Sequence, residues 1–418
     1  MGGGATASPS KRDALAAFER GDEDAAERLT AALRDYPNDG ALLIAEASAR
    51  LRSGRAEPFA RLEAILNQAP DWIEGHKGLS RLKAEAQDPA PLSSLEGALR
   101  KLPRHPGLWM AYLTLLGSAA RHSEAAQHAA NLRQRIADLP ELRLVEARHR
   151  GFAGQAAEAQ DLLKGLPDSL PELDFERARN ALRLGDLARA SEALDRTVKR
   201  NPNDIGAWAL TEICWRANKD PRHEWLCPDA NIFVQSDLSL SARELADLAE
   251  VLKVMHVTRS APLGQSVEGG TQTHGNLRLR IEPEIARIFQ AIDAALAEYA
   301  AGLPPVHPDH PLAPLAGKTP QIMASWSILL SSGGRHVPHL HDGGRVSSAA
   351  HIAVPSEMQV DEGALELGCP PEDIALDITP LARFAAIPGH LVLFPSFVYH
   401  STTRFEAGER LTLAFDAV

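Results

Sequence analysis

Three histidines stand close together in the second half of the chain, at a spacing suited to binding a metal ion. His336, His339 and His341 lie within the segment 335–344. On a β-strand, residues i and i+2 share one face, so His339 and His341 can reach the same cation. A third ligand must come from elsewhere, and the candidate is His400, which closes an apolar run. We expect His336 to lie at the surface or behind the ligands.

An arginine and a threonine follow His400 at a spacing typical of a strand. Arg410 lies ten residues after His400, and Thr412 lies two residues further along. In a strand these two side chains share one face, while Leu411 and Leu413 take the other. The offset from the histidine favours a place for Arg410 in the pocket of the metal ligands over a surface ion pair.

The region around these residues is predicted to be a β-sandwich or jelly roll. From position 321 onward the chain shows short apolar runs cut by Gly and Pro, and short strands at such spacing are typical of these folds. The runs are 328–330, 349–354, 391–394 and 411–415. Two helices are predicted before them, at 241–256 and 283–301. The glycine-rich, polar segment between these helices has no nucleotide-binding pattern, so we do not interpret it as a phosphate loop.

The first half of the chain is an internal repeat of helix pairs. Helix-breaking prolines recur with a mean spacing of 33 residues, at Pro37, Pro70, Pro103, Pro140, Pro167 and Pro202. Glycines form a second ladder with a similar period, at Gly21, Gly54, Gly117, Gly154 and Gly185. This helix–turn–helix period resembles that of tetratricopeptide repeats over residues 9–215. Such stacks usually hold a peptide or another protein, but they also scaffold a neighbouring domain or build a dimer, and the period does not separate these roles.

The composition excludes several classes of protein. The chain has 418 residues and a formal net charge of −11, which argues against a general nucleic-acid binder. Its three cysteines have no CxxC spacing, which argues against a disulfide framework and a structural zinc finger. No apolar run approaches the ~20 residues of a membrane span, and the amino terminus lacks a secretory signal. We therefore expect a soluble, cytoplasmic protein with neither a nucleic-acid nor a membrane partner, and we leave open whether it is a homodimer.

The expected fold class is α+β, with more than one domain. We predict a flexible leader at 1–8, followed by an all-α tetratricopeptide-like solenoid at 9–215. The remainder, 216–418, is predicted to be a double-stranded β-helix, or jelly roll, with flanking helices.

The combined pattern resembles the non-haem Fe(II)- and 2-oxoglutarate-dependent oxygenases. It is closer still to a bacterial group of them that carries amino-terminal tetratricopeptide repeats. The residues that carry this resemblance are Gly270–Thr273, Asn276–Leu277, Ser325–Ser327, Pro338–His341, Ser347–Ser348, Gly363–Gly368, Leu391–Ser396, His400 and Arg410–Phe415. The resemblance spans most of 205–418.

The resemblance implies a role for each of the residues singled out above. His339, His341 and His400 would hold Fe(II), with positions left open for oxygen and a co-substrate. Arg410 would pair bidentately with the distal carboxylate of 2-oxoglutarate, a geometry that lysine cannot match, and Thr412 would donate a hydroxyl beside it. The implied reaction is hydroxylation of a C–H bond, with 2-oxoglutarate converted to succinate.

Two features depart from the pattern of that family. Most of its members have His-x-Asp or His-x-Glu where this chain has His339 and His341, and the nearest carboxylate, Asp342, would point to the opposite strand face unless a bulge rotates it. Ala350 and His351 follow the serine pair at positions where relatives tend to have aromatic residues that help to line the co-substrate pocket.

Further polar and aromatic residues are candidates for the pocket or its surroundings. Trp326 is expected in the core more than in contact with a substrate. Gln272, Thr273 and Asn276 either line the pocket or satisfy a buried turn, and we favour the turn. His351 is a candidate for the pocket or for a place behind it.

The leading functional hypothesis is an oxygenase that hydroxylates a peptide or protein recruited by the repeats. One alternative is a non-catalytic adaptor with a degenerate jelly roll, which the missing carboxylate and the replaced aromatics favour. Another is a small-molecule hydroxylase whose repeats serve only in assembly.

Overall fold

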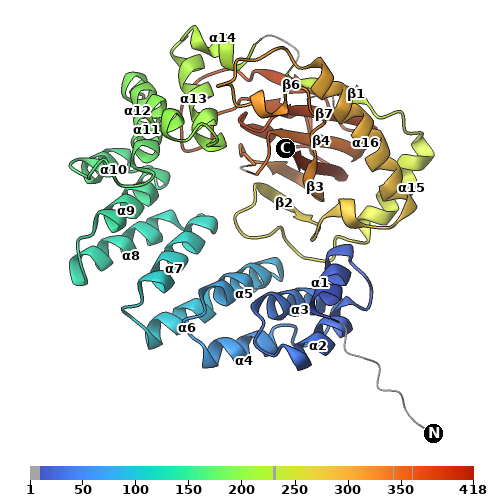
Figure 1. Ribbon diagram of the computed structural model, residues 1–418, viewed down its shortest axis with the longest axis horizontal. Coiled ribbons are helices and arrows are strands. Elements are labelled where there is room, and N and C mark those ends of the chain that lie inside the picture. Colours follow the sequence, from blue (N-terminus) through green and yellow to red (C-terminus); the bar gives the residue numbers. More distant parts are fainter. Residues whose placement is uncertain (1–9, 229–231, 342, 360) are drawn as a thin grey trace.

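The computed structural model describes residues 10–228, 232–341, 343–359 and 361–418. The predicted leader and Asp342 lie outside the described residues. Helices make up the first half of the chain, and antiparallel sheets with flanking helices make up the second (Figure 1). The predicted α+β class is therefore confirmed, whereas the boundary between residues 215 and 216 stays a prediction.

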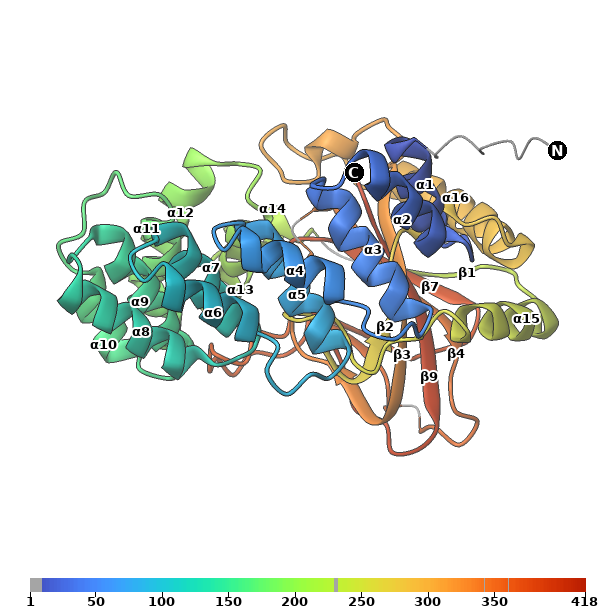
Figure 2. The ribbon, with the colours of Figure 1, turned by 90° about the horizontal axis from the view of Figure 1, so that it is seen from below.

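The repeats are hairpins of two helices each, and successive hairpins stack along a curve (Figures 1 and 2). The helices are α1 (Lys11–Arg20), α2 (Ala25–Asp35), α3 (Gly40–Arg52), α4 (Ala60–Gln68), α5 (Ile73–Glu85), α6 (Ser93–Lys101), α7 (Pro106–Ser118), α8 (His122–Arg135), α9 (Pro140–Phe152), α10 (Ala156–Leu163), α11 (Leu173–Arg183), α12 (Leu187–Arg200) and α13 (Ile205–Ala217). The prolines of the ladder lie between hairpins or, like Pro140, in the first turn of a helix, where a missing N–H costs nothing.

Four of the five glycines in the ladder follow the end of a helix, and the fifth lies inside one. Gly21, Gly54, Gly154 and Gly185 have φ of 73°, 62°, 78° and 72°, the left-handed conformation that ends a helix at no steric cost. Gly117 instead lies within α7, where a Cβ would come within 2.8 Å of His149 Cε1. Close packing of two helices, rather than a turn, requires glycine there.

The second half contains two antiparallel sheets. Its elements are α14 (Arg222–Leu226), β1 (Val234–Asp237), α15 (Ala242–Lys253), β2 (Val267–Gln272), η1 (Leu277–Leu279), α16 (Pro283–Gly302), η2 (Ala313–Leu315), β3 (Ile322–His336), β4 (Val346–Ala353), β5 (Leu365–Leu367), β6 (Ala382–Phe384), β7 (His390–Pro395), β8 (His400–Thr402) and β9 (Glu409–Ala417). The strand orders are β1-β7-β4-β9-β3-β2 and β6-β5-β8. This arrangement is the predicted jelly roll.

Strand β9 shows how the large sheet separates core from site. Leu411, Leu413 and Phe415 belong to the main apolar cluster, which also contains buried residues of α15 and α16. Arg410 and Thr412 take the alternate positions, so they face the interior of the jelly roll. The two helices cover the outer face of the sheet, and the inner face carries polar side chains together with a small apolar cluster.

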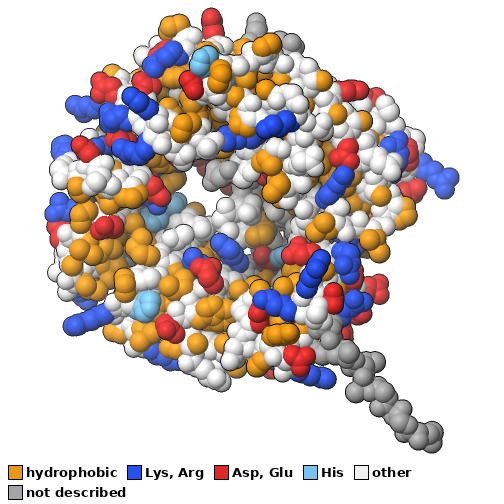
Figure 3. All heavy atoms as spheres, viewed as in Figure 1, with side chains coloured by type: hydrophobic (Ala, Val, Ile, Leu, Met, Phe, Trp, Pro, Cys, Tyr) orange, Lys and Arg blue, Asp and Glu red, His pale blue; other side chains and the backbone are white. Residues whose placement is uncertain are grey.

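The solenoid contacts the sheet domain in two separate regions (Figure 1). Near α11 and α13, it packs against a strap formed by residues 369–381, between β5 and β6, and Arg179 and Arg183 both donate hydrogen bonds to Asp373, at 2.7 and 2.8 Å. Near α5, the backbone N–H of Arg259 donates to Glu85 O at 3.1 Å. The molecule is hollowed between these contacts (Figure 3). In the part of the chain that the structure describes, no helix combines the length and apolar character needed to cross a membrane.

We expect Asp373→Asn to weaken the junction between repeats and strap. Burial alone would raise the pKa of Asp373, but Arg179 and Arg183 outweigh it and hold the pKa below its usual value. Neutralising one partner of such a largely buried set costs about 3 kcal/mol. The wild-type contribution is present above the unfolded pKa of about 3.9 and is lost as pH falls through the lower folded pKa.

Thermal unfolding measured from pH 7 to pH 3 checks this expectation. The variant should unfold at a lower temperature at pH 7, and the difference from the wild type should shrink towards pH 3. Asp247→Asn, which breaks the exposed pair with Arg243, is the control and should change stability by less than about 0.5 kcal/mol. A pH-independent difference for Asp373→Asn would contradict the assignment.

Candidate metal centre

A single backbone bridge joins the two segments that carry the histidines. His339 N donates to His400 O at 3.0 Å, and His400 N donates to His339 O at 3.1 Å. We predicted a strand through residues 339–341, and this was wrong: β3 ends at His336, and Pro338, which has no N–H, interrupts the ladder. The isolated bridge is enough to place the two side chains beside each other.

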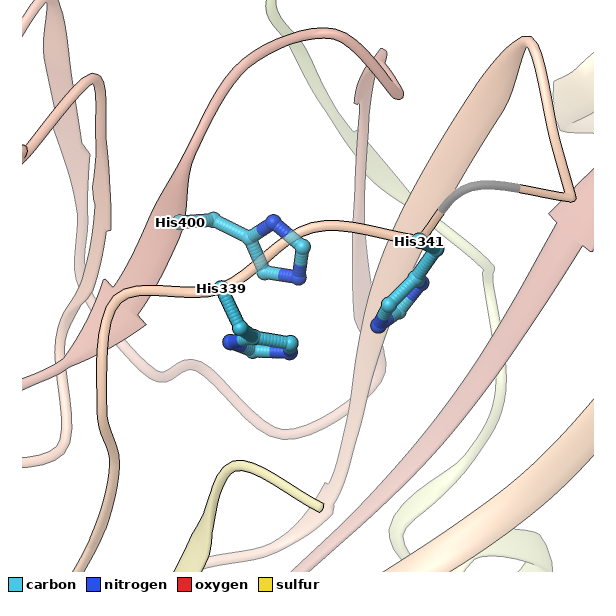
Figure 4. Close-up of side chains that lie close together, drawn as sticks. All are labelled: His339, His341 and His400. Atoms are coloured by element: carbon cyan, nitrogen blue, oxygen red, sulfur yellow. The ribbon is translucent and has the colours of Figure 1, made fainter. Parts of the chain in front are cut away.

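The three imidazole rings converge on one point (Figure 4). Ring centroids are 4.0 Å apart for His339 and His400, 5.1 Å for His339 and His341, and 4.9 Å for His341 and His400. One nitrogen of each ring lies within 4.8 Å of the other two. Three ligand atoms at these separations fit a single transition-metal ion with positions open to exogenous ligands.

Hydrogen bonds set the orientation of each ring. Nδ1 of His339 donates to Val337 O at 2.9 Å, and Nδ1 of His400 points at Val398 O at 3.4 Å. Nδ1 of His341 donates to Asp416 Oδ1 at 2.8 Å. Because each acceptor carries no proton, Nδ1 keeps the hydrogen and Nε2 keeps the lone pair that a metal needs.

Asp416 is a functional residue that the sequence reasoning missed. Its side chain is 11% exposed and also accepts a hydrogen bond from Ser347 Oγ at 3.1 Å. It lies on the same face of β9 as Arg410 and Thr412, so the period of two along this strand was a signal that could have found it. A carboxylate behind His341 makes the ring a stronger ligand. It also places a negative charge near a centre whose three ligands are imidazoles and not carboxylates.

Burial keeps two of the ligands, His339 and His400, in their neutral form. Desolvation, with a smaller contribution from the neighbouring His341, lowers the pKa of His339 to about 3. Desolvation likewise holds the pKa of His400 well below its usual value, with His339 and His341 acting in the same direction. Neutral rings offer lone pairs to a cation at physiological pH.

Arg410 is a buried cation without an anion. Arg410 is 1% exposed, and desolvation lowers the pKa of its guanidinium to about 10. Within the described part of the chain, Nε and Nη1 have no hydrogen-bond partner. An unpaired buried charge is costly, so this guanidinium is suited to an anionic ligand.

A small cavity connects Arg410 with the histidines. Its volume is about 40 Å³. The lining residues are Gln265, Ser266, Gln272, Trp326, Ile328, His336, His339, His341, Ser348, Ala349, Leu365, His400, Thr402, Arg410, Thr412 and Ala414. The predicted set of histidines, arginine and threonine therefore meets in one pocket, and the pocket can present a cation and a guanidinium to the same ligand.

Of the other candidate residues, two line the cavity and two stabilise the chain around it. Gln272 lines the cavity, and so does Trp326, whose ring meets His341 edge-on at 5.2 Å. Thr273 and Asn276 hold the chain near β3: Thr273 Oγ1 accepts from the backbone of Ser327 at 2.9 Å, and Asn276 Oδ1 accepts from Arg278 N at 3.1 Å.

His336 lies closer to the site than expected from the sequence, and His351 lies next to a pocket residue, as one of its two predicted places requires. His336 lines the cavity, and its ring stacks on His339 with centroids 5.4 Å apart and planes 18° apart. His351 is fully buried and pairs in register with Thr412 across the β4–β9 ladder. Asp342, the alternative carboxylate, lies outside the described residues.

Part of the sheet domain is similar to a known family. Residues 324–416 match the family described as “Putative 2OG-Fe(II) oxygenase”. The match extends through β3, β4 and most of β9 and includes the three histidines and Arg410. No curated protein matches the chain.

Solved structures resemble the two halves separately. A Pseudomonas putida prolyl-4-hydroxylase is 19% identical over 44% of this chain and 91% of that one, with a TM-score of 0.30. A prolyl hydroxylase from Trichoplax adhaerens, in complex with a hypoxia inducible factor peptide fragment, is 13% identical over 49% of this chain and 92% of that one, with a TM-score of 0.32. A tetratricopeptide repeat protein from Parabacteroides merdae is 19% identical over 51% of this chain and 88% of that one, with a TM-score of 0.35. These likenesses are too distant to carry a functional argument.

Asp416→Asn should weaken metal binding without preventing folding. The amide keeps the shape of the side chain but removes the charge behind His341, and loss of such a partner typically lowers metal affinity about 10–100-fold. Calorimetric titration of the metal-free chain with Fe(II) under anaerobic conditions measures the effect. Asp293→Asn, in an exposed pair with Arg278, should bind as the wild type does; equal affinity in both variants would contradict the role of Asp416.

Proposed function

We propose that this chain, in which helical repeats precede a domain of the 2OG-Fe(II) oxygenase family, is an Fe(II)- and 2-oxoglutarate-dependent hydroxylase. The observation that supports this most is the unpaired Arg410 guanidinium in the same buried pocket as three convergent imidazoles. A metal site alone would not need a buried cation nearby. A ligand that carries a carboxylate and also reaches the metal explains both features.

Different residues would bind the metal and the 2-oxo acid. Nε2 of His339, His341 and His400 would hold the metal, and Asp416 orients the second of these rings. Bound iron with a 2-oxo acid supplies the activation of dioxygen that C–H hydroxylation requires. Arg410 would take the distal carboxylate, because a guanidinium donates two parallel hydrogen bonds to it.

Thr412, which lines the pocket, and His351 beside it would extend the anion-binding end. The two residues lie opposite each other in the β4–β9 register. Burial and the charge of Arg410 lower the pKa of His351 to about 3, so its ring is neutral and offers one N–H. Among the described residues neither ring nitrogen of His351 has a hydrogen-bond partner. A threonine hydroxyl and an imidazole N–H beside Arg410 are both suited to carboxylate oxygens.

Arg410→Ala should raise the concentration of 2-oxoglutarate required while leaving the metal bound. Removal of a buried partner of a carboxylate costs about 2–5 kcal/mol. Succinate formation as a function of 2-oxoglutarate concentration, together with metal analysis of the purified chain, measures the two effects separately.

Arg404→Ala is a matched control, because this arginine is 56% exposed and pairs with Glu268 at the surface. It should leave both quantities unchanged. Loss of metal in Arg410→Ala would contradict the role given to the guanidinium. A wild-type chain that binds no Fe(II) would favour the alternative of a non-catalytic adaptor.

The substrate that we favour is a peptide or protein held between the two halves of the molecule. A hollow of about 880 Å³ lies between α9–α13 and the segment that carries His339 and His341. Phe152 and Phe175 line it from the repeats, and Pro338, Leu340 and Tyr399 line it from the sheet domain. Pro338 and Leu340 alternate with His339 and His341 along the chain, so a substrate in the hollow would lie against the segment that holds the centre.

A small-molecule substrate is the second candidate. The strap 369–381 already occupies part of the repeat surface, where Ile374, Leu376 and Ile378 pack with residues of α11–α13. Repeats that bind their own domain in this way serve in assembly, as this alternative requires.

Phe175→Ala distinguishes these two substrates. If a peptide binds in the hollow, the variant should raise KM for protein substrates several-fold, since a buried aromatic contact contributes about 1–3 kcal/mol, while uncoupled turnover of 2-oxoglutarate stays unchanged. The assay incubates iron-loaded chain and 2-oxoglutarate with peptide mixtures and measures a mass gain of one oxygen atom. Leu184→Ala, exposed and outside the hollow, is the control. Unaltered KM in Phe175→Ala would favour the small-molecule alternative.

A further inference from the structure

We propose that residues 258–266, which we call the arm, are a positioning element through which the repeats hold the mouth of the metal pocket. The arm connects α15 to β2 and contains neither helix nor strand. One end of it is bound to the repeats and the other to His336. The effect of the arm on catalysis rests on the proposed function, whereas the physical connection between the repeats and His336 does not.

The repeats hold the first part of the arm by backbone and side-chain hydrogen bonds. Arg259 N donates to Glu85 O at 3.1 Å, and Gln87 Nε2 donates to Arg259 O at 3.2 Å. Ser260 Oγ donates to Ala84 O at 2.9 Å. The acceptors and donors lie at the end of α5, where carbonyl groups have no partner within the helix. The arm thus donates hydrogen bonds to backbone carbonyl groups at the end of a repeat helix.

Apolar packing anchors the middle of the arm. Leu263 packs against the repeat cluster that contains Leu92, Leu108 and Leu116. Gly264 has a φ of +84°, and a Cβ there would lie 3.2 Å from Ser118 of α7. The backbone of the arm therefore approaches α7 as closely as a glycine allows.

The last residues of the arm belong to the pocket. Gln265 and Ser266 both line the cavity. Ser266 O accepts from Val337 N at 3.0 Å, and Ser266 Oγ lies 2.9 Å from Nδ1 of His336. The ring of His336 stacks on His339, so a continuous set of contacts runs from α5 and α7 to a proposed metal ligand.

Through this set of contacts, the repeats help to position residues that line the pocket. The arm forms no strand, and its contacts up to Gly264 are with the repeats, so the position of this part depends on the helices that it touches. A partner that shifts α5 or α7 would move Ser266 and loosen the support of His336. The repeats would then influence the pocket through the arm, whether or not they also bind the substrate.

Hydrogen–deuterium exchange of the full-length Leu263→Ala variant, without metal, tests the link. Losing this packing should free the arm, so that amides of 262–268 and of 334–340 exchange about tenfold faster than in the wild type. Leu163→Ala is the matched control: it removes the same side chain from a separate repeat cluster that contains no residue of the arm. Its effect should remain within α9 and α10 and the loop that follows them.

A second measurement separates this inference from the proposed function. Titration of the Fe(II)-loaded chain with 2-oxoglutarate, followed by the visible charge-transfer absorption of the complex, should give several-fold weaker binding for Leu263→Ala and unchanged binding for Leu163→Ala. A wild-type chain without this absorption would contradict the proposed function and leave the exchange result standing.

Unchanged exchange of 334–340 in Leu263→Ala, or equal acceleration there in Leu163→Ala, would overturn the arm as a positioning element. If Leu263→Ala does not fold, Ser260→Ala provides the same test, because it removes only the hydrogen bond to Ala84 O.

Discussion

The pair of backbone hydrogen bonds between His339 and His400 is the contact on which the centre depends. It joins two segments that are sixty-one residues apart in the chain. No other ladder holds His339, because Pro338 interrupts the strand before it. The surrounding elements serve to fix this contact: β9 supplies Asp416 behind His341, and the flanking helices bury the outer face of the sheet.

Electrostatics in the pocket are unusual because cations outnumber anions. The three ligands are imidazoles and not carboxylates, and Arg410 adds a positive charge that the described residues do not pair. Asp416 is the carboxylate that reaches the centre, and it does so through His341. A site of this kind favours an anionic co-substrate, since binding it removes the cost of the buried guanidinium as well as completing the metal's ligands.

The repeats and the sheet domain form one closed arrangement (Figures 1 and 3). The strap packs on α11–α13 with its aspartate held by two arginines, and the arm packs on α5 and α7. Both segments belong to the sheet domain, and both use surface that repeat stacks normally offer to other molecules. The hollow that we assign to a substrate lies beside the strap, between α9–α13 and the segment that carries His339 and His341.

Local patterns in the sequence determined much of this protein. Proline and glycine periodicity predicted the helix pairs, and alternation around Arg410 predicted which residues of β9 face the pocket, because both signals arise from the geometry of single elements. The identity of the three histidines followed from spacing and resemblance.

Only the tertiary structure decided how distant segments meet. Asp416, His336 and Ser266 came to the pocket through packing between elements, and Gly117 was required by a neighbouring helix, not by a turn. The same is true of the arm and the strap, whose positions depend on repeats more than a hundred residues away. Spacing along the chain carries no information about such contacts, since they are selected by the burial and pairing of groups that meet after folding.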